Sequence, residues 1–508
     1  MKHLAHYLVN KIFSSCVWGF KTLKLTYALR VTKKPNLPSV VVIGAGPAGM
    51  AFACRYIEHG GKVKLLEASP FVGGLARSFE LWGSTVDLGP HRFFSADPVV
   101  NKYWHSHVKE DFIMVNRLTR IYYMGKFFNY PLQAINALSN LGLVKAFLAL
   151  QSYIFCKIFP PKQDGSLENW VISKFGSKLF RTFFKVYTEK VWGISCKEID
   201  ADWAAQRIQG LTLWGAIKSA IFGNKDNKLK TLVDEFAYPK TGNSLFYERQ
   251  QEYIQKSGNH LYLNRPVEKI VIKDSMIKGV ITREGELHAA SVVISTMPIT
   301  LLIKGIDGVP EDVVKASLDL TFRNTILVYL QIEKSSLFED QWLYIHDPEL
   351  MHGRITNFNN WSGEMIGDKS KTIICMEFWC FDSDQIWEES DEDLIERSKR
   401  ELVKTGLCKV GDIAKGKVLK IKKSYPVYRR GYKEKLKIVQ DYLDSIEGLH
   451  PIGRYGSFKY NNQDHSILMG LLAADSISNG SSINLWNVNT ESTYQESASS
   501  HSLREITD

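Results

Sequence analysis

The sequence predicts an α/β protein: a parallel sheet assembled from separate stretches of the chain, with an inserted α+β domain of helices and an antiparallel sheet. Three observations predict this fold. A short apolar, β-branched run at 40–43 precedes a glycine-rich turn and a helical pattern from 48 to about 59. A second apolar run follows at 63–66, and helical and alternating patterns fill 111–424. Uninterrupted apolar strands are typical of parallel sheets that helices cover on both faces.

The glycine-rich turn carries the chemistry of this first unit. Gly44, Gly46 and Gly49 have the spacing G-x-G-x-x-G, and Glu67 ends the next strand. Glycine permits the tight turn and lets the backbone approach a pyrophosphate, which the free N–H groups of a helix N-terminus then bind. Together with the acid at the second strand, this order predicts a Rossmann-like dinucleotide site. We assign to it Gly44, Gly46, Pro47, Ala48, Gly49, Glu67 and Ala68.

A second glycine loop follows the second strand. It reads Gly-Gly-Leu-Ala-Arg-Ser at 73–78 and is followed by Asp-Leu-Gly-Pro-His at 87–91. Two adjacent glycines let the backbone pass close to a flat ring system and its phosphates. This loop resembles the flavin-binding loop of FAD enzymes of the amine oxidase and UDP-galactopyranose mutase superfamily, so the expected cofactor is FAD. The resemblance adds Gly74, Leu75, Ala76, Gly89 and His91 to the cofactor site.

Composition sets broad limits on the class of protein. The chain has 508 residues, 44% of them hydrophobic and 23% charged, which is ordinary for a globular protein of two or three domains. Its net charge of +10 favours an acidic partner, such as a phosphorylated substrate or an anionic membrane. Basic residues are scattered rather than striped, so no nucleic-acid partner is expected. Seven dispersed cysteines without a C-x-x-C pair predict buried, reduced thiols, no metal site and a cytoplasmic location.

The first 38 residues form a basic leader. Seven lysines and arginines interleave with apolar residues there, and no acidic residue precedes Glu58. The longest uncharged run, 12–20, is too short to cross a bilayer. We consider three interpretations: an amphipathic helix within 1–30 on an anionic membrane surface, an organelle transit peptide, or a helix packed on the core before a linker.

The remaining elements are predicted in chain order. Helices are expected at 132–159, 167–184, 201–221 and 391–407, the first of them buried rather than membrane-spanning. Strands are expected at 118–124, 260–263, 267–272, 277–282, 325–332, 342–345, 354–358 and 372–380, and an apolar strand that starts at 292 is expected to end in the Ser-Thr-Met-Pro stretch at 295–298, near a cofactor. The predicted domains are a leader (1–38), a cofactor-binding domain in three parts (39–110, 238–300 and 425–485), a helical substrate domain (111–237), a sheet-containing substrate domain (301–424) and a disordered tail (486–508).

Further stretches resemble UDP-galactopyranose mutases, in the same order along the chain. They are NYPLQ at 129–133, KVW at 190–192 with Trp203 and Arg207, YPKTG at 238–242, WLY at 342–344 with GRITNF at 353–358, and GRYGSFKY at 453–460 with NQDHS at 462–466. Two departures stand out: Pro90 and Thr241 occupy positions where those mutases tend to carry glycine. The GPHRFF and GRYG patterns also occur in flavoproteins grouped with protoporphyrinogen oxidases.

The resemblance implies a role for each matched residue. Arg207 and Arg354 would clamp a diphosphate, because planar guanidinium groups bind phosphate oxygens through two hydrogen bonds; with His91, which would support the flavin, they are the expected catalytic residues. The further expected cofactor residues are Val267, Gly453, Arg454, Asn462, Gln463, Asp464 and Ser466. The expected substrate residues are Tyr130, Gln133, Trp192, Arg207, Arg354, Asn357, Tyr425 and Tyr460.

Plainer interpretations of single residues stay open beside these roles. His91 could serve only to satisfy buried carbonyl groups, and Asp464 could only cap its helix. Either arginine could belong to a surface ion pair.

The implied function is an isomerase that acts on a nucleotide sugar, most simply a UDP-sugar, through N5 of a flavin reduced by NAD(P)H. The alternative is an FAD-dependent oxidase or desaturase acting on a lipid or a ring compound. The sequence does not define an oligomeric state.

Overall fold

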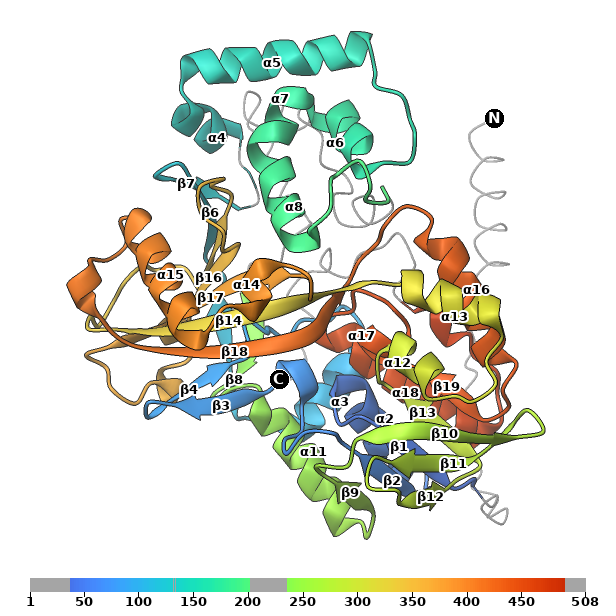
Figure 1. The fold of residues 1–508 in the computed structure, drawn as a ribbon. Helices are drawn as coiled ribbons and strands as arrows, with labels where there is room; N and C mark the ends of the chain where they lie inside the picture. Colours follow the sequence, from blue (N-terminus) through green and yellow to red (C-terminus); the bar gives the residue numbers. More distant parts are fainter. Residues whose placement is uncertain (1–36, 131, 133, 202–234, 489–508) are drawn as a thin grey trace, which may run out of the picture. The chain divides into compact units, whose positions relative to one another are not determined.

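The computed structural model describes residues 37–130, 132, 134–201 and 235–488. Its parallel sheet has five strands in the order β19-β13-β1-β2-β9 (Figure 1). Every neighbouring pair is parallel. The central strand β1 is buried along its whole length, since all four of its residues are apolar. The strands are β1 (Val40–Ile43), β2 (Val63–Leu66), β9 (His260–Tyr262), β13 (Val292–Ser295) and β19 (Leu449–Pro451).

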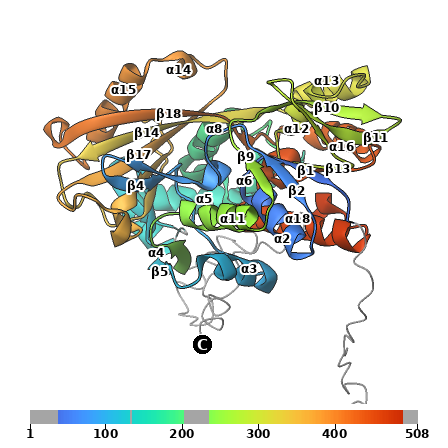
Figure 2. The ribbon, with the colours of Figure 1, turned by 90° about the horizontal axis from the view of Figure 1, so that it is seen from below.

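This sheet confirms the predicted fold, because three distant segments of the chain supply its strands. The helices α2 (Pro47–Glu58) and α18 (Gln463–Asn479) contact each other beside the sheet, with α11 (Ser244–Lys256) against α2 (Figure 2). A Cβ added at Gly470 would lie 2.3 Å from the carbonyl oxygen of Ala48, so the two backbones are in close contact. Arg55 on α2 donates from Nε to Oδ1 of Asp475 at 2.7 Å. The first and last of these three segments are therefore in direct contact.

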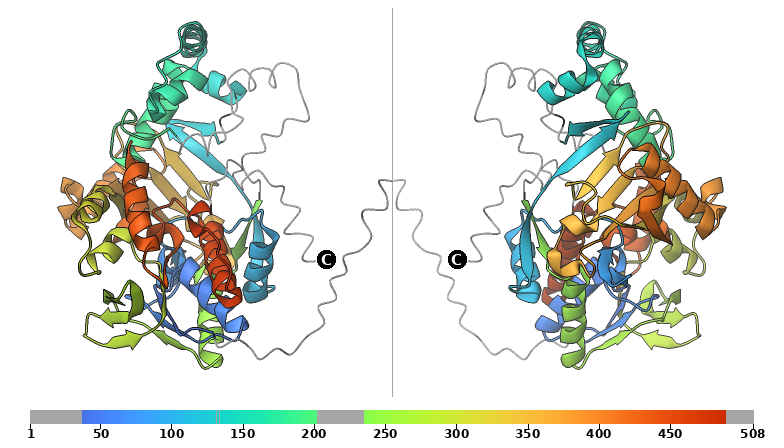
Figure 3. Two further views of the ribbon diagram at one scale, coloured as in Figure 1. Left: turned by 90° about the vertical axis from the view of Figure 1, so that its right-hand side faces the viewer. Right: turned by 90° about the vertical axis from the view of Figure 1, so that its left-hand side faces the viewer.

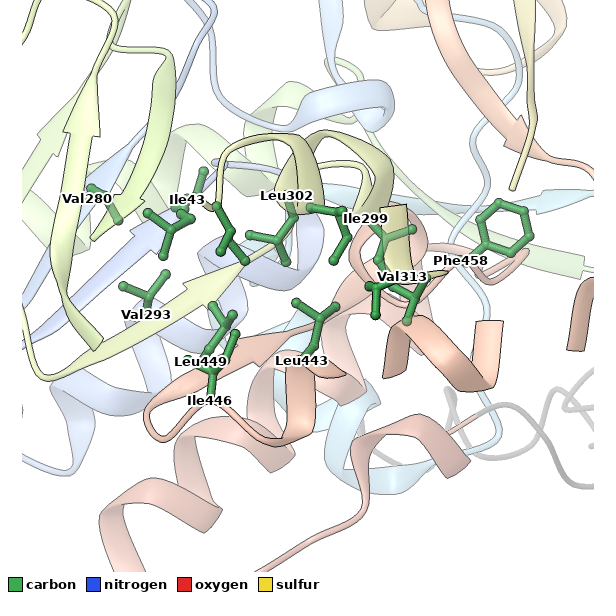
Figure 4. Close-up of a cluster of buried hydrophobic side chains, with 14 of the residues drawn as sticks. Ile43, Val280, Val293, Ile299, Leu302, Val313, Leu443, Ile446, Leu449 and Phe458 are labelled. Atoms are coloured by element: carbon green, nitrogen blue, oxygen red, sulfur yellow. The ribbon is translucent and has the colours of Figure 1, made fainter. Parts of the chain in front are cut away.

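A hydrophobic cluster packs a second layer against the parallel sheet. It joins Ile43 and Val293 of the strands to Leu302 and Leu443 of the covering helices (Figure 4). Each such side chain, fully buried, contributes about 1.5–3 kcal/mol of stabilisation. The covering elements are α12 (Ile299–Lys304), α13 (Glu311–Asp319), α16 (Tyr432–Asp444) and the small sheet β10 (Val267–Lys273), β11 (Met276–Thr282) and β12 (Leu287–Ala289).

The second large sheet has seven strands in the order β18-β14-β17-β16-β15-β6-β7. All of its neighbours are antiparallel except β15 and β6. Strands β14 and β17 are buried at every residue, and α15 (Asp391–Lys404) contacts the sheet. The strands are β6 (Thr119–Tyr123), β7 (Lys126–Asn129), β14 (Phe322–Ile332), β15 (Trp342–Ile345), β16 (Arg354–Asn357), β17 (Thr372–Cys380) and β18 (Ile413–Pro426).

Several shorter elements connect the two sheets. They are the hairpin β3 (Ser78–Leu81) and β4 (Ser84–Asp87), the pair β5 (Phe112–Asn116) and β8 (Glu235–Pro239), α3 (Pro98–Val108), α14 (Gln385–Glu388) and α17 (Gly453–Gly456). Strand β5 was not predicted, because only its pairing with β8, more than 100 residues later in the chain, identifies it.

Strand β18, with 14 residues, is the longest strand that the sequence analysis did not predict. Its lysines obscure the alternation, yet Val418 and Ser424 are buried and it pairs with β14 along most of its length. The strand runs across the predicted boundary at 424/425, and it carries Tyr425. The predicted boundary between the sheet-containing substrate domain and the third part of the cofactor-binding domain therefore falls inside one strand.

The helical part differs from expectation in burial and in continuity. The segment 132–159 is helical, but as α4 (Ala134–Leu141) and α5 (Leu143–Ile158), and the predicted burial of α5 is wrong: Leu143 is 90% and Phe147 60% exposed. The predicted helix 167–184 is interrupted, because Gly176 adopts φ +82°. It comprises α6 (Leu167–Phe175), α7 (Ser177–Leu179) and a π-helix (Phe180–Lys185), followed by α8 (Val186–Trp192).

Some predictions lie outside the described residues. They concern the leader up to residue 36, nearly all of the helix at 201–221, and the tail beyond 488. Figure 3 shows the described helices α4–α8, in teal and green, beyond the seven-stranded sheet, at the end opposite the parallel sheet.

The helix–turn contact at Gly49 gives a test of the fold. A Cβ there would lie 2.0 Å from the carbonyl oxygen of Gly44, so Gly49→Ala should lower the free energy of unfolding by about 1–3 kcal/mol and reduce FAD content. Urea unfolding and flavin absorbance per protein measure both effects. Gly411→Ala is the matched control, since its Cβ would meet no atom within 4 Å. Equal stability of the two variants would contradict this account of the turn.

Candidate functional site

The two glycine loops meet backbone to backbone at the end of β1. Gly44 has φ +97°, and a Cβ on it would lie 2.1 Å from Oγ1 of Thr296, which follows β13. A Cβ on Gly74 would lie 3.1 Å from Cα of Gly46, the residue before α2. No side chain caps the N-terminus of α2, so its first N–H groups stay available to a ligand. The loops form a narrow cradle that side chains would fill, with the geometry that a pyrophosphate requires.

Glu67 closes one side of this cradle. Its Oε2 accepts a hydrogen bond from the backbone N–H of Ala45 at 2.7 Å, and its Oε1 accepts one from Ser69 at 2.8 Å. A carboxylate can accept about four hydrogen bonds, so capacity remains for ribose hydroxyl groups. Through these hydrogen bonds, Glu67 at the end of the second strand holds the glycine turn in place, and it also lines the cavity.

A cavity of about 580 Å³ begins at the cradle and continues into the seven-stranded sheet. That volume is within the usual range for ligand sites. The first turn of α18, with Asn462 before it, also lines the cavity, so a second helix N-terminus contributes partial positive charge. The far end has aromatic and aliphatic walls around two charged residues: Thr325, Leu327, Trp342, Tyr344, Arg354, Trp361, Glu377, Ile421 and Tyr425.

His91 lies between the two ends of the cavity. Its Nδ1 is 3.1 Å from the carbonyl oxygen of Gly89, which agrees with the simpler interpretation of this histidine. Burial lowers the pKa of His91 to about 4; the Gly89 carbonyl opposes this shift, and the charges of Arg354 and Arg454 add to it. The imidazole is therefore neutral at physiological pH and places no charge on this part of the cavity wall.

A buried hydrogen-bond network supports the loop that carries His91. Both carboxylate oxygens of Asp87 accept hydrogen bonds: Oδ1 from Ser78 at 2.6 Å, and Oδ2 from the Tyr238 hydroxyl at 2.7 Å and Asn243 Nδ2 at 2.6 Å. Asn243 Nδ2 also lies 2.6 Å from the carbonyl oxygen of His91. Burial raises the pKa of Asp87 to about 6, although these hydrogen bonds oppose the shift. The network ties three separate segments to one loop.

Arg354 and Glu377 form a buried, two-bond ion pair at the far end. Nε donates to Oε1 and Nη2 to Oε2, both at 2.6 Å, and the side chains are 15% and 2% exposed. The residues lie opposite each other on β16 and β17. The ion pair is internal, not the surface pair considered above. Glu377 uses two of the five N–H donors, so two on Nη1 and one on Nη2 remain for a ligand.

Aromatic rings enclose the same end. The Arg454 guanidinium lies 4.8 Å from the Tyr425 ring centre and 4.4 Å from that of Tyr460, and the rings are 5.5 Å apart. Arg454 also donates to the carbonyl oxygens of Ser424 and Asn461. Burial and the neighbouring Tyr460 raise the pKa of Tyr425 to about 12, so its hydroxyl stays protonated and can donate to a phosphate or sugar oxygen.

Most residues expected at the site line this one cavity. On its wall are Gly44, Gly46, Pro47, Ala48, Glu67, Ala68, Gly74, Leu75, Ala76, His91, Val267, Arg354, Tyr425, Gly453, Arg454, Tyr460, Asn462, Gln463, Asp464 and Ser466. Gly49 and Gly89 lie behind the wall. Asp464 is inside α18, whose N-cap is Asn462, so the structure does not support a capping role for Asp464.

Three expected substrate residues are not on the wall. Tyr130 packs on the wall residue Tyr344, with ring centres 5.0 Å apart, and Trp192 is buried against Tyr428. Asn357 is buried, and its Nδ2 donates to the carbonyl oxygen of Phe338. Gln133 and Arg207 lie outside the described residues.

The wall also includes residues that the sequence analysis did not assign. Thr296 belongs to the Ser-Thr-Met-Pro stretch after β13, whose position at the end of a parallel strand was a usable signal. Trp342 and Tyr344 belong to the WLY stretch quoted above, although no role was assigned to them. Others, including Arg265, Arg283 and Glu377, depend on long-range packing that leaves no local pattern.

Within the described residues, no group of three or more His, Cys, Asp or Glu side chains could hold a metal ion. Among the helices in that part of the chain, none is both long enough and apolar enough to cross a membrane. The six cysteines that the structure describes are free and buried, as predicted.

The glycine cradle, Glu67 directly after β2 and the long cavity together define a dinucleotide-binding fold. Residues 47–408 match the family described as flavin containing amine oxidoreductase. The chain therefore belongs to this family and is an FAD-dependent enzyme, so the predicted cofactor is confirmed.

Two individual relatives have low sequence identity to this chain. A probable UDP-galactopyranose mutase of Klebsiella pneumoniae is 26% identical over 183 residues, which are 33% of this chain and only 44% of that protein. A 15-cis-phytoene desaturase of Glycine max is 23% identical over 89% of this chain and 82% of that protein.

Solved structures share the fold. A reduced UDP-galactopyranose mutase superposes with a TM-score of 0.78 at 22% identity, covering 90% of this chain and 99% of that one. A putative protoporphyrinogen oxidase from Exiguobacterium gives a TM-score of 0.67 at 16% identity, covering 87% and 99%.

The neutral His91 predicts a pH dependence of stability. Its pKa of about 4 lies below the ordinary value near 6.5, so the unfolded chain binds the proton first as the pH falls. From about pH 8 to about pH 5, the wild type should lose about 2 kcal/mol more unfolding free energy than His91→Gln. Urea unfolding at saturating FAD measures this difference; parallel pH profiles of the two proteins would contradict it.

The buried ion pair predicts strong coupling between its partners. Arg354→Met should lower the free energy of unfolding by about 3–5 kcal/mol, because it leaves the Glu377 carboxylate buried without its cation. The double variant Arg354→Met with Glu377→Met removes both charges and should recover most of that loss. A double-mutant cycle of urea unfolding measures the coupling, and purely additive effects would rule it out.

Proposed function

We propose that this FAD-dependent enzyme is a UDP-galactopyranose mutase-like isomerase that acts on a nucleotide sugar. The observation that carries the proposal is the chamber beyond His91, where Arg354 lies among the rings of Tyr344, Tyr425 and Tyr460. Flat rings suit the base and sugar of a nucleotide sugar, and a guanidinium suits its diphosphate. The likeness to mutases in sequence and in fold supports the same substrate class.

In this proposal, FAD binds at the glycine end of the cavity. The first turn of α2 and the loop at Gly74 would hold the pyrophosphate, and Glu67 would bind the ribose. The first turn of α18 and His91 would contact the ring system. FAD, reduced by NAD(P)H, supplies a nucleophilic nitrogen when bound. A neutral His91 adds no positive charge there to those of Arg354 and Arg454.

The substrate end would bind and orient the nucleotide sugar. Nη1 of Arg354 would donate to a diphosphate oxygen, while Glu377 holds the guanidinium plane at a fixed angle. The protonated hydroxyl of Tyr425 would donate to a second oxygen. Arg207, the other proposed diphosphate residue, lies outside the described residues. We place the enzyme in the cytoplasm, consistent with its free thiols.

A second candidate is an oxidoreductase acting on a lipid or ring compound. The match to a 15-cis-phytoene desaturase, which extends over 89% of the chain, favours it. The two candidates differ in the flavin state they need. An isomerase requires reduced flavin and consumes no net electrons, whereas a desaturase requires oxidised flavin and an electron acceptor.

The test uses the FAD-loaded enzyme and UDP-galactopyranose without oxygen. Chromatography should detect conversion to a ring-contracted isomer only after dithionite reduction. Arg354→Lys should weaken UDP binding by about 10–100-fold in calorimetry and leave the flavin spectrum unchanged, because lysine cannot reproduce the planar fork. Arg397→Lys is the control, since Arg397 pairs with Glu389 away from the cavity wall.

The possible outcomes separate the candidates. A yellow enzyme that neither binds UDP nor converts the sugar when reduced would exclude the isomerase and leave the oxidoreductase. Wild-type UDP affinity in Arg354→Lys would exclude this role for Arg354.

A further inference from the structure

Helix α5 exposes its apolar side to solvent. Eight apolar side chains of this helix are between 39% and 90% exposed: Leu143, Val144, Phe147, Leu148, Leu150, Ile154, Phe155 and Ile158. We name this set the apolar face of α5. Scattered exposed apolar residues are normal on a protein surface, but a continuous patch of this kind marks an interaction site.

The helix is amphipathic, with its apolar arc directed outward. Its buried residues Ala149, Tyr153 and Cys156 form a narrow stripe against α6 and α7. At about 100° per residue, the apolar face covers an arc of roughly 160° on the other side. Gln151 is the one polar side chain within that arc. Figure 1 shows α5 at the outer edge of the helical part, beyond α6–α8 as seen from the seven-stranded sheet.

Positive charge surrounds the apolar face. Lys145 borders the apolar arc on one side, and Lys162 follows the helix. Lys157 borders the other side, where its Nζ donates to the carbonyl oxygen of Ser173 at 3.1 Å. From 112 to 163 the sequence contains no Asp or Glu. Long lysine side chains can extend from such a border to phosphate groups while their methylenes stay in apolar surroundings. An apolar arc between two basic borders is the pattern of a helix that lies in the headgroup layer of an anionic bilayer.

The same charges disfavour a second copy of the chain as the occupant. A symmetric contact between two α5 faces would bring their basic borders together, and like charges repel each other where water is excluded. The 16 residues of α5 are also too few to span a bilayer. The basic leader at 1–38 has the same combination of apolar residues and lysines without an acid.

We propose that α5 is a membrane-docking helix, with its apolar face inserted in the headgroup region of a bilayer that contains anionic lipid. This surface is separate from the cavity, because none of its residues lines the cavity wall. The proposal is independent of which substrate the enzyme takes.

The test measures the partition of the full-length, FAD-loaded protein onto vesicles of phosphatidylcholine mixed with phosphatidylglycerol. Phe147→Ser with Phe155→Ser should reduce the partition coefficient about tenfold or more, since two exposed rings leave the interface. Leu318→Ser is the matched control: Leu318 is 74% exposed on α13, outside the proposed surface, and its variant should bind like the wild type. Flavin absorbance checks that each variant is folded.

Lipid charge gives an independent arm of the experiment. Lys145→Gln with Lys162→Gln should weaken binding to the mixed vesicles and leave the weaker binding to pure phosphatidylcholine unchanged. Three results would overturn the proposal. They are equal vesicle binding by the Phe147→Ser/Phe155→Ser variant and the wild type, no vesicle binding by the wild type, and a vesicle-free dimer in sedimentation velocity that this variant abolishes.

Discussion

Three distant segments meet at one glycine turn, and the shape of the cavity depends on how closely they approach. Thr296 of the second segment occupies the space where Gly44 would carry a Cβ, and Gly453 of the third lies against Ala48. Each approach is possible only because a side chain is missing. The backbone itself therefore sets the width of the cradle, which explains why the glycines are needed for packing as well as for ligand contact.

Three titratable groups on or behind the cavity wall are held by internal partners or are neutral. Asp87 accepts hydrogen bonds from three residues, Arg354 is paired with Glu377, and His91 is neutral. Groups held in this way do not have to reorganise when a charged ligand enters, and such preorganisation is a main source of catalytic power. The cavity thus combines an apolar, ring-lined wall with a few fixed polar groups.

Local patterns identified residues at the glycine end of the cavity much better than residues at its far end. The glycine spacing and Glu67 lie within one strand–helix–strand unit, so the sequence alone identifies them. The pair of Arg354 and Glu377 depends on the register of β16 and β17, which no local pattern fixes. The Asp87 network joins residues more than 150 positions apart.

Two of the differences between the predicted and the observed fold have the same kind of cause. Strand β18 was missed because its lysines obscure the alternation and its pairing with β14 is long-range. Helix α5 was expected to be buried because apolar residues usually are. Which side of an apolar helix has neighbours is a property of the tertiary structure, and sequence periodicity does not report it.

The position of β19 and α18 in the sequence has a consequence for biosynthesis. These elements complete the parallel sheet and one cavity wall, yet they follow every other strand of that sheet in the sequence. While the ribosome is still adding residues before 449, the nascent polypeptide exposes the apolar edge of β13 and the side of α2 that α18 later covers. Such an unpaired edge is prone to aggregation, and the cavity wall is complete only after residues 463–479 have been synthesised.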